Sequence, residues 1–225
     1  MAKQIPFDLP TRPALGRDAF FVAPSNAVAL ASIDGWQTWP GRKMVLTGPK
    51  GAGKTHLAHV WAAQSGARIV AAADLAGADI VALASGPVAV EDADAIAGDR
   101  DAEEALFHLH NLVLAEGHTL LLTAQTPPAR WGLTLPDLTS RMQGTLLATL
   151  DQPDDQLLMA MLLKLFADRQ LSPTPNALAY LLRHMDRSAA AAAELVARID
   201  RRSLAEGRRI TRGLAAEVLD NPDDL

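Results

Sequence analysis

The 225-residue chain contains no cysteine, which excludes disulfides, thiolate metal ligands and cysteine nucleophiles. It also lacks a basic excess, since 21 Lys and Arg stand against 26 Asp and Glu, for a formal net charge of -5. Strong direct DNA binding is not expected, because binding to phosphate backbones is driven by positive charge. Aromatic residues are only 4% of the chain, and its four tryptophans do not alternate with basic residues. We therefore expect the tryptophans to pack in or around the core.

Long hydrophobic runs are missing as well. No stretch approaches the roughly 18 consecutive apolar residues of a membrane helix, and the first residues do not form the apolar segment of a signal peptide. These absences predict a cytoplasmic protein without a membrane partner. With 49% hydrophobic residues, the chain is long enough to bury the core of one ordinary domain and a smaller second one.

Short apolar runs and helical stretches alternate along the first two thirds of the chain. A helix capped by Ser25 is expected to run to Gly35, and further helices are expected near 56–63 and 103–115. Five segments are predicted as strands: 44–47, 68–72, 87–90, 119–123 and 145–150. Alternation of this kind predicts an α/β fold with a parallel sheet covered by helices on both faces.

The pattern changes after Pro153, where apolar residues recur only at helical spacing. The predicted helices cover 157–165, 177–184, 189–204 and 211–219. The sequence thus predicts a flexible tail at 1–13, an α/β domain at 14–150 and a small all-helical domain at 151–225, with no further domain expected after Leu219.

The segment between the first predicted strand and the helix after it fits the pattern of glycine, four residues, glycine, lysine and then threonine. Backbone N–H groups of such a loop cradle phosphates, and the following helix adds the positive end of its dipole. Lys54 is expected to reach the β- and γ-phosphates of ADP or ATP, and Thr55 to place its hydroxyl on Mg²⁺. The predicted nucleotide-binding residues are Gly48, Pro49, Lys50, Gly51, Ala52, Gly53, Lys54 and Thr55.

An acidic pair follows the third predicted strand and is expected to complete this site. Glu91 and Asp92 stand where an acidic residue holds Mg²⁺, and Glu91 occupies a position where aspartate is usual. The alternative is an acidic helix start, in which Asp92, Asp94 and Asp99 act as caps. The glutamate is expected to alter the metal geometry, and together with Gln125 and Ala190, considered below, it predicts nucleotide binding with weak or no hydrolysis.

Other polar residues are interpreted more simply. His56 and His59 lie three residues apart without an evident third metal ligand, so a packed or solvated pair is expected. Acidic residues interleave the arginine pairs at 201–202 and 208–209, which favours a solvated face over a basic patch.

The order of these features resembles a known family. The phosphate loop, the acidic segment 91–99, the segment 121–128 and the segment 135–141 are similar to the AAA+ core of the bacterial replication initiator DnaA and, more closely, to the Hda-type regulators related to DnaA. The resemblance implies an AAA+ fold with a helical lid. It also implies that Arg141 is an arginine finger acting in trans, the alternative being a structural salt bridge at a helix end.

The resemblance extends to both ends of the chain. It implies that Gln4, Ile5, Phe7 and Leu9 bind the DNA polymerase sliding clamp, whereas the residues alone allow a plain disordered tail.

Two positions of the nucleotide site depart from the family pattern. Gln125 stands at the sensor position of the nucleotide site, where an acidic residue or asparagine is expected. Ala190 replaces the arginine of the lid, and Arg187, about one turn away, is expected to contact the nucleotide instead.

These implications combine into one functional expectation and two alternatives. The expected protein is tethered to the clamp and promotes hydrolysis of ATP bound to its partner DnaA, with a homodimer as a possible assembly. The first alternative is an autonomous oligomeric AAA+ ATPase of the helicase-loader type. The second is a small-molecule phosphotransferase built on the same loop.

Overall fold

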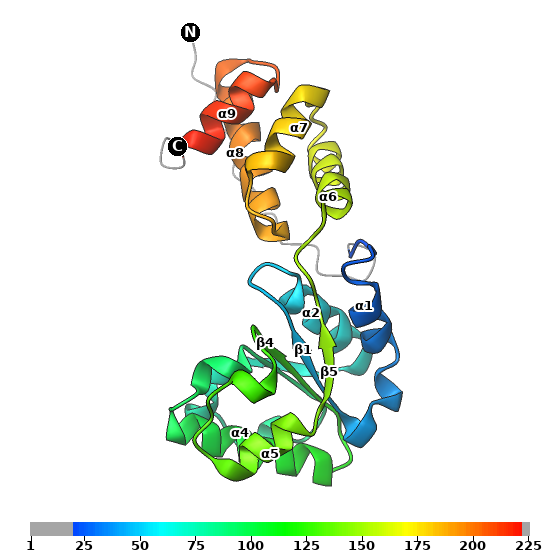
Figure 1. Ribbon diagram of the computed structural model, residues 1–225, viewed down its shortest axis with the longest axis vertical. Coiled ribbons are helices and arrows are strands. Elements are labelled where there is room, and N and C mark those ends of the chain that lie inside the picture. Colours follow the sequence, from blue (N-terminus) through cyan, green and yellow to red (C-terminus); the bar gives the residue numbers. More distant parts are fainter. Residues whose placement is uncertain (1–19, 222–225) are drawn as a thin grey trace. The chain divides into compact units, whose positions relative to one another are not determined.

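The computed structural model describes residues 20–221 of the chain. Those residues form two compact units that divide between Gln152 and Pro153 (Figure 1). The predicted clamp-binding residues Gln4, Ile5, Phe7 and Leu9 lie outside the described residues. No helix within residues 20–221 is long and apolar enough to cross a membrane.

The first unit is built on a five-stranded sheet in the order β2-β3-β4-β1-β5. Every neighbouring pair is parallel, so the carboxyl ends of all five strands lie at one edge of the sheet and their amino ends at the other. The strands are β1 (Lys43–Thr47), β2 (Arg68–Ala71), β3 (Val88–Glu91), β4 (Leu120–Ala124) and β5 (Leu146–Thr149).

Helices connect these strands and cover the sheet. The helices are α1 (Ala27–Asp34), α2 (Lys54–Ser65), α3 (Ile80–Leu83), α4 (Arg100–Ala115) and α5 (Pro136–Gln143), and the 3₁₀ turns are η2 (Trp36–Thr38), η3 (Pro40–Arg42), η4 (Ala72–Gly77), η5 (Ala93–Ile96) and η6 (Pro128–Arg130). Side chains of a strand alternate between its two faces. Met44 and Leu46 therefore pack in one core with α1 and α2, while Val45 packs in the other with α4 and α5.

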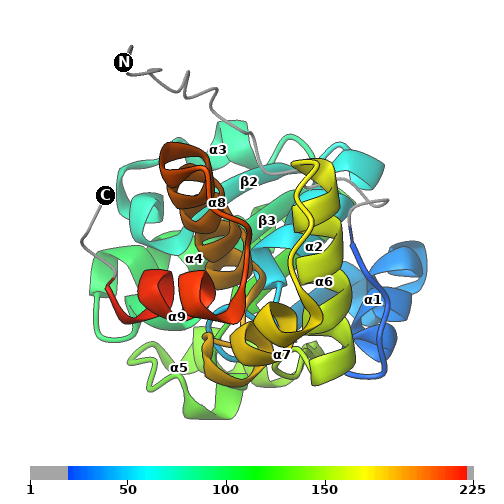
Figure 2. The same cartoon turned by 90° about the horizontal axis from the view of Figure 1, so that it is seen from above.

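The second unit contains four helices around its own core. They are α6 (Asp155–Asp168), α7 (Pro175–His184), α8 (Ala189–Glu206) and α9 (Arg212–Asp220), seen from above in Figure 2. Buried residues recur at helical spacing in each of them, as with Leu158, Leu162 and Phe166 in α6. The predicted α/β sheet between helices, followed by an all-helical region, is confirmed.

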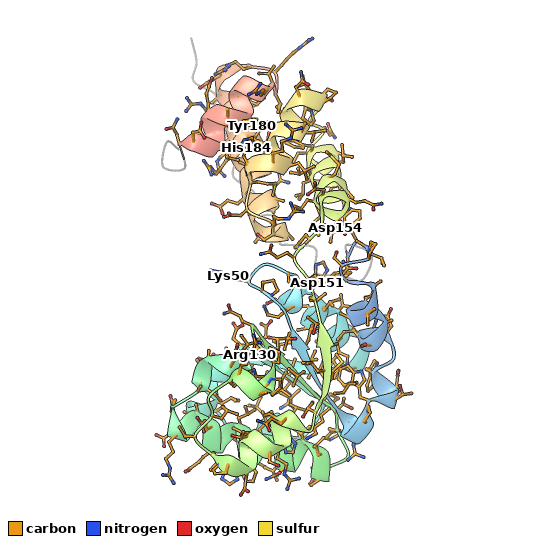
Figure 3. The ribbon with its side chains drawn as sticks, viewed as in Figure 1. Lys50, Arg130, Asp151, Asp154, Tyr180 and His184 are labelled. Atoms are coloured by element: carbon orange, nitrogen blue, oxygen red, sulfur yellow. The ribbon has the colours of Figure 1, made fainter. Side chains whose placement is uncertain are left out.

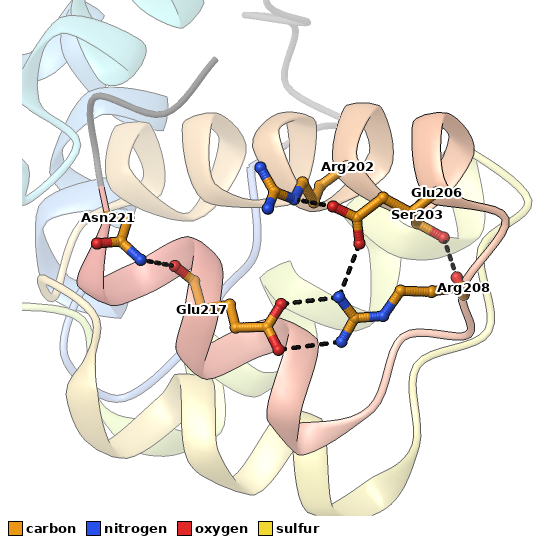
Figure 4. A network of polar contacts seen from close by, with 6 residues as sticks. All are labelled: Arg202, Ser203, Glu206, Arg208, Glu217 and Asn221. Atoms are coloured by element: carbon orange, nitrogen blue, oxygen red, sulfur yellow. Dashed lines mark hydrogen bonds and ion pairs between the residues drawn. The ribbon is translucent and has the colours of Figure 1, made fainter.

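Arg202 of α8 and Arg208, which follows that helix, take part in ion pairs (Figure 4). Arg208 pairs with Glu206 at 2.7 Å and, through two nitrogens, with Glu217 of α9, while Arg202 pairs with Glu206. The network joins the end of α8 to α9. Because these side chains are partly exposed, each pair adds little to stability.

The predicted helix cap at Ser25 is wrong. Helix α1 begins after Asn26, and no side chain bonds to its first N–H groups. Asn26 instead faces the preceding segment, where its Oδ1 accepts from the Ala23 N–H at 2.9 Å and its Nδ2 donates to the Phe21 carbonyl at 2.8 Å. Asn26, the residue before the helix, therefore bonds back to the preceding segment instead of capping the first turn of α1.

A buried carboxylate holds the loop that leads into α5. Glu103 of α4 has no exposed surface, and its oxygens accept from the N–H groups of Gly98, Thr134 and Leu135 and from the Thr134 hydroxyl, at 2.8–3.0 Å. Burial raises the pKa of Glu103, but the hydrogen bonds from Thr134, Gly98 and Leu135 lower it by more than burial raises it. The pKa of Glu103 therefore lies below the ordinary value of 4.5. Glu103 thus fixes the start of α5 as a charged acceptor.

Replacing this acceptor should destabilise the fold. Glu103→Gln should lower the free energy of unfolding by about 3 kcal/mol, because an amide nitrogen cannot accept and leaves buried donors unpaired. Urea denaturation would measure this loss. Glu104→Gln is the matched control: Glu104 pairs with Arg100 on the surface, so its loss should cost less than about 0.5 kcal/mol. Equal losses would contradict the role of Glu103. Because the pKa of Glu103 is lowered in the folded protein, its carboxylate stabilises the fold fully above the ordinary pKa of 4.5. The difference in unfolding free energy between Glu103→Gln and the wild type should therefore shrink as the pH falls below that value.

Candidate nucleotide-binding site

The glycines of the phosphate loop are required by its geometry. A Cβ atom on Gly48 would lie 2.5 Å from the carbonyl oxygen of Leu150, closer than real Cβ contacts. Gly51 and Gly53 have φ angles of 81° and 103°, in the left-handed region that other residues adopt only at a cost. The loop therefore holds its shape only with glycine at these positions.

The loop is hydrogen-bonded to the carboxyl edge of the sheet and is followed directly by a helix. The N–H of Gly48 donates to the carbonyl of Ala124 at the end of β4, at 3.2 Å. Helix α2 begins at Lys54, directly after Gly53, and the first N–H groups of a helix have no intrahelical acceptor. Such N–H groups at the positive end of a helix dipole form an anion-binding site.

Lys54 is folded back onto this loop. Its side chain is buried, and Nζ donates to the carbonyls of Gly48 at 2.8 Å and Pro49 at 3.0 Å. Burial lowers the pKa of Lys54, whereas the charges of Asp92, Asp94 and Glu91 act in the opposite direction. Lys54 and the predicted acidic residues Glu91 and Asp92 are therefore close enough to interact electrostatically. Thr55 at the helix start and Lys50 in the loop (Figure 3) are exposed.

The acidic end of β3 carries an unsatisfied oxygen. Glu91 is the last residue of the strand, and its Oε1 is buried without a hydrogen-bond partner. Asp92 follows in a left-handed conformation with φ of 53°, and its N–H donates to Thr123 Oγ1 at 3.1 Å. An orphaned carboxylate oxygen is a ligand type that Mg²⁺ takes, so Glu91 and the Thr55 hydroxyl fit the predicted metal. The glycine cradle and Lys54 fit the phosphates of a nucleotide.

The end of β4 lies between these two parts, because β4 is paired with both β1 and β3. Gln125 directly follows β4 and has an exposed side chain. Its N–H and that of Thr126 donate to Asp94 Oδ2 at 2.9 and 3.1 Å. Asp94, considered from the sequence only as a cap, instead ties the loops after β3 and β4 together and so fixes the backbone of Gln125.

The remaining polar residues near the loop have structural contacts. Phe20 meets the ring of His56 edge-on at 5.1 Å, and His59 Nδ1 lies 2.9 Å from the carbonyl of Thr55. No group of three metal-binding side chains occurs among residues 20–221. Trp39 stacks on Trp61 with ring centroids 5.6 Å apart, as the packing interpretation of the tryptophans predicts.

Arg141 lies at the opposite edge of the sheet. It is exposed in the last turn of α5, and its carbonyl accepts from Nζ of Lys43, the first residue of β1, at 2.8 Å. From Lys43 to Gly48 the strand spans about 16 Å at 3.3 Å per residue. In the described part of the chain, no carboxylate pairs with the Arg141 guanidinium, so the alternative of a structural salt bridge has no partner there.

A buried histidine stands beside Lys43. His110 of α4 is 2% exposed, with Nε2 3.2 Å from Lys43 Nζ and Nδ1 3.1 Å from Asn111 Oδ1. Burial lowers the pKa of His110, the hydrogen bond to Asn111 raises it, and the charges of Lys43 and Arg141 lower it. The imidazole is therefore neutral at pH 7, and its Nε2 accepts from the ammonium.

Arg187 belongs to the helical unit and has partners within it. Its guanidinium pairs with Asp155 at 2.6 Å and donates to the carbonyl of Pro153 at 3.0 Å. A contact with nucleotide, as expected from the sequence, would compete with this ion pair. The pair is partly exposed, so breaking it costs little.

The parallel sheet, the phosphate loop and the helical unit together define the fold of AAA+ domains. The chain is similar to domain III of the Thermotoga maritima replication initiation protein DnaA, with a TM-score of 0.78 and 18% identity over 95% of this chain and 98% of that one. AMPPCP-bound DnaA from Aquifex aeolicus gives a TM-score of 0.72 and 18% identity over 87% and 68% of the two chains. A Thermotoga maritima RuvB mutant gives 0.69 and 18% over 89% and 70%. No family model matches the chain.

Sequence reasoning missed the roles of Glu103, His110, Lys43 and Asp94. For two of them a signal was present: Glu103 and His110 are polar residues on the stripe of α4 that also carries Ala102, Leu106 and Leu109. A polar group on an apolar stripe needs a buried partner. Lys43 and Asp94 gave no such signal, because neither lies on the apolar stripe of a helix.

Lys54 should dominate the affinity for nucleotide. We expect Lys54→Ala to weaken ADP binding by about 100-fold, because a buried cation that meets the phosphates is lost. Isothermal titration with ADP and Mg²⁺ would measure the change. Lys50→Ala is the matched control: Lys50 lies in the same loop but is exposed, and its loss should change the affinity by less than about threefold. Unchanged binding by the Lys54 variant would place the nucleotide elsewhere.

His110 should titrate below the ordinary histidine pKa of 6.5. Because its folded pKa is lowered, the unfolded chain takes up the proton first, so the free energy of unfolding should fall as the pH drops from about 6.5 towards the folded pKa. NMR of the His110 ring would follow the titration. Lys43→Met should raise the pKa of His110 only in part, since burial remains; a pKa at or above 6.5 in the wild type would contradict this prediction.

Proposed function

We propose that this protein is a nucleotide-binding AAA+ regulator of replication initiation, which promotes hydrolysis of ATP bound to DnaA. The observation that carries the proposal is the position of Arg141: exposed, without a carboxylate partner among the described residues, and at the sheet edge opposite its own phosphate loop. About 16 Å of β1 separate this edge from the chain's own phosphate loop. The guanidinium therefore acts on the phosphate of a second chain.

The chain's own nucleotide is ADP or ATP, held on residues 48–55. Lys54 exchanges its bonds to the loop carbonyls for phosphate oxygens, and the N–H groups at the start of α2 bind the same phosphates. Thr55 and Glu91 hold Mg²⁺, which neutralises phosphate charge. Asp92 and Gln125 border the site at the ends of β3 and β4.

We expect little hydrolysis at this site. Glu91 places its carboxylate one methylene farther from the strand than an aspartate would, and Gln125 cannot act as a base. In the helical unit, Arg187 is engaged by Asp155 and Ala190 carries no polar group. Bound nucleotide then serves to set the conformation of the domain, while hydrolysis occurs on the partner.

Arg141 acts on the nucleotide of DnaA. A guanidinium placed against the γ-phosphate stabilises the charge that spreads over its oxygens in the transition state. Gln4, Ile5, Phe7 and Leu9, outside the described residues, bind the sliding clamp. Such a tether turns a weak encounter into one at high effective concentration. The similarity in fold to domain III of the DnaA protein supports the nucleotide-binding part of this scheme.

The same geometry also supports the alternative of an autonomous oligomeric ATPase of the helicase-loader type. In that case Arg141 meets the phosphate of a second copy of this chain. ATP turnover by the isolated protein that rises with its concentration distinguishes the two functions.

The decisive experiment follows hydrolysis of ATP bound to purified DnaA in the presence of clamp loaded on DNA. The wild type should accelerate hydrolysis, and Arg141→Ala should reduce that acceleration on the order of 10³-fold. Arg100→Ala is the matched control, since Arg100 is an exposed arginine that pairs with Glu104 on the surface, and this variant should accelerate hydrolysis as much as the wild type. Equal acceleration by both variants would exclude the arginine finger. If none accelerates and the isolated protein consumes ATP, the alternative holds.

A further inference from the structure

The ammonium of Lys43 is held between two neutral acceptors. Its Nζ donates to the carbonyl oxygen of Arg141 at 2.8 Å and lies 3.2 Å from Nε2 of His110. Nδ1 of that ring faces the side-chain amide oxygen Oδ1 of Asn111 at 3.1 Å, so Nδ1 carries the proton and Nε2 accepts. Three elements, β1, α4 and α5, therefore meet at one cation.

These contacts do not neutralise the positive charge of Lys43. Lys43 is half-buried, and no carboxylate in residues 20–221 pairs with it. The charge that acts on it is that of another cation, Arg141, which lowers the pKa of Lys43 after the larger effect of burial. Placing two cations together costs free energy, so stabilisation of the fold does not by itself explain a lysine at this position.

The bond to Arg141 fixes the end of a short helix. The last carbonyls of a helix have no intrahelical donor, and Arg141 is two residues from the end of α5. Lys43 Nζ and Thr145 Oγ1, both at 2.8 Å, satisfy its carbonyl oxygen, and a cation there also meets the negative end of the helix dipole. Glu103 holds the loop at the other end of α5, so the helix is fixed at both ends.

We propose that Lys43, oriented by the neutral imidazole of His110, is the positioning residue of Arg141. Its hydrogen bond fixes the Arg141 backbone to the central strand β1, and its charge repels the guanidinium outward, towards the phosphate of a second chain. This inference rests on the proposed role of Arg141 in trans. It adds that a second cation, Lys43, positions the Arg141 side chain without itself touching the phosphate.

The first test needs no partner and measures amide hydrogen exchange in the full chain. The N–H of Gly144 bonds to Ser140 and that of Thr145 to Met142, so both report on the last turn of α5. Lys43→Met should raise exchange at these two amides roughly tenfold, as expected for one lost bond to a charged donor. The amide of Leu57 in α2 should not change.

Two further variants serve as controls for exchange. Lys43→Arg keeps a cationic donor and should restore the wild-type rates at Gly144 and Thr145. Lys164→Met removes an exposed lysine of α6 and should change neither. Exchange that is unchanged in Lys43→Met, or that rises equally throughout the chain, overturns the inference.

The second test separates positioning from docking in the DnaA assay. Lys43→Met should lower the maximal stimulated rate at least tenfold, leave the half-saturating protein concentration unchanged, and be rescued by Lys43→Arg. In the Arg141→Ala background, Lys43→Met should have no further effect, because Lys43 acts through Arg141. An equal further loss in that background overturns the inference. If the wild type itself fails to stimulate DnaA, the proposed function fails, and the exchange result still decides whether Lys43 fixes Arg141.

Discussion

The central position of strand β1 is the constraint on which both candidate sites depend. Parallel hydrogen bonds join β1 to β4 on one side and β5 on the other, so β1 cannot change register without breaking two ladders and turning its buried side chains to the wrong cores. Its five residues therefore set a fixed separation between the phosphate loop, which follows Thr47, and the Arg141 carbonyl, which is bonded to Lys43.

Polar side chains determine the geometry at each end of that strand. Asp94 joins the loops after β3 and β4 at the carboxyl edge, and Lys43 joins β1, α4 and α5 at the amino edge. A buried polar group destabilises a fold unless it is hydrogen-bonded, and then it favours a single arrangement. Glu103 shows this most fully, since its carboxylate is buried and accepts from three backbone N–H groups.

The sequence predicted local features well and long-range ones poorly. The phosphate loop was predictable because its glycines and Lys54 are contiguous, and the helices of the second unit because each repeats apolar residues at helical spacing. Two predicted strands, 87–90 and 119–123, lie one residue later in the structure, since strand ends depend on pairing with neighbours. The Ser25 cap failed because α1 begins one residue later and Asn26 bonds back to the segment before it. The alternative of capping by Asp94 failed because this carboxylate accepts from the distant backbone of the loop after β4.

The charges of the two edges bear on how such a domain associates. Although the whole chain carries a net charge of -5, Lys43 and Arg141 gather positive charge at the amino edge, while Glu91, Asp92 and Asp94 lie at the carboxyl edge. Repulsion between the two cations is relieved when an anion approaches, and a nucleotide on a second AAA+ domain lies at that domain's carboxyl edge. Contact between unlike edges is heterologous, which distinguishes it from a symmetric homodimer, in which like edges would meet.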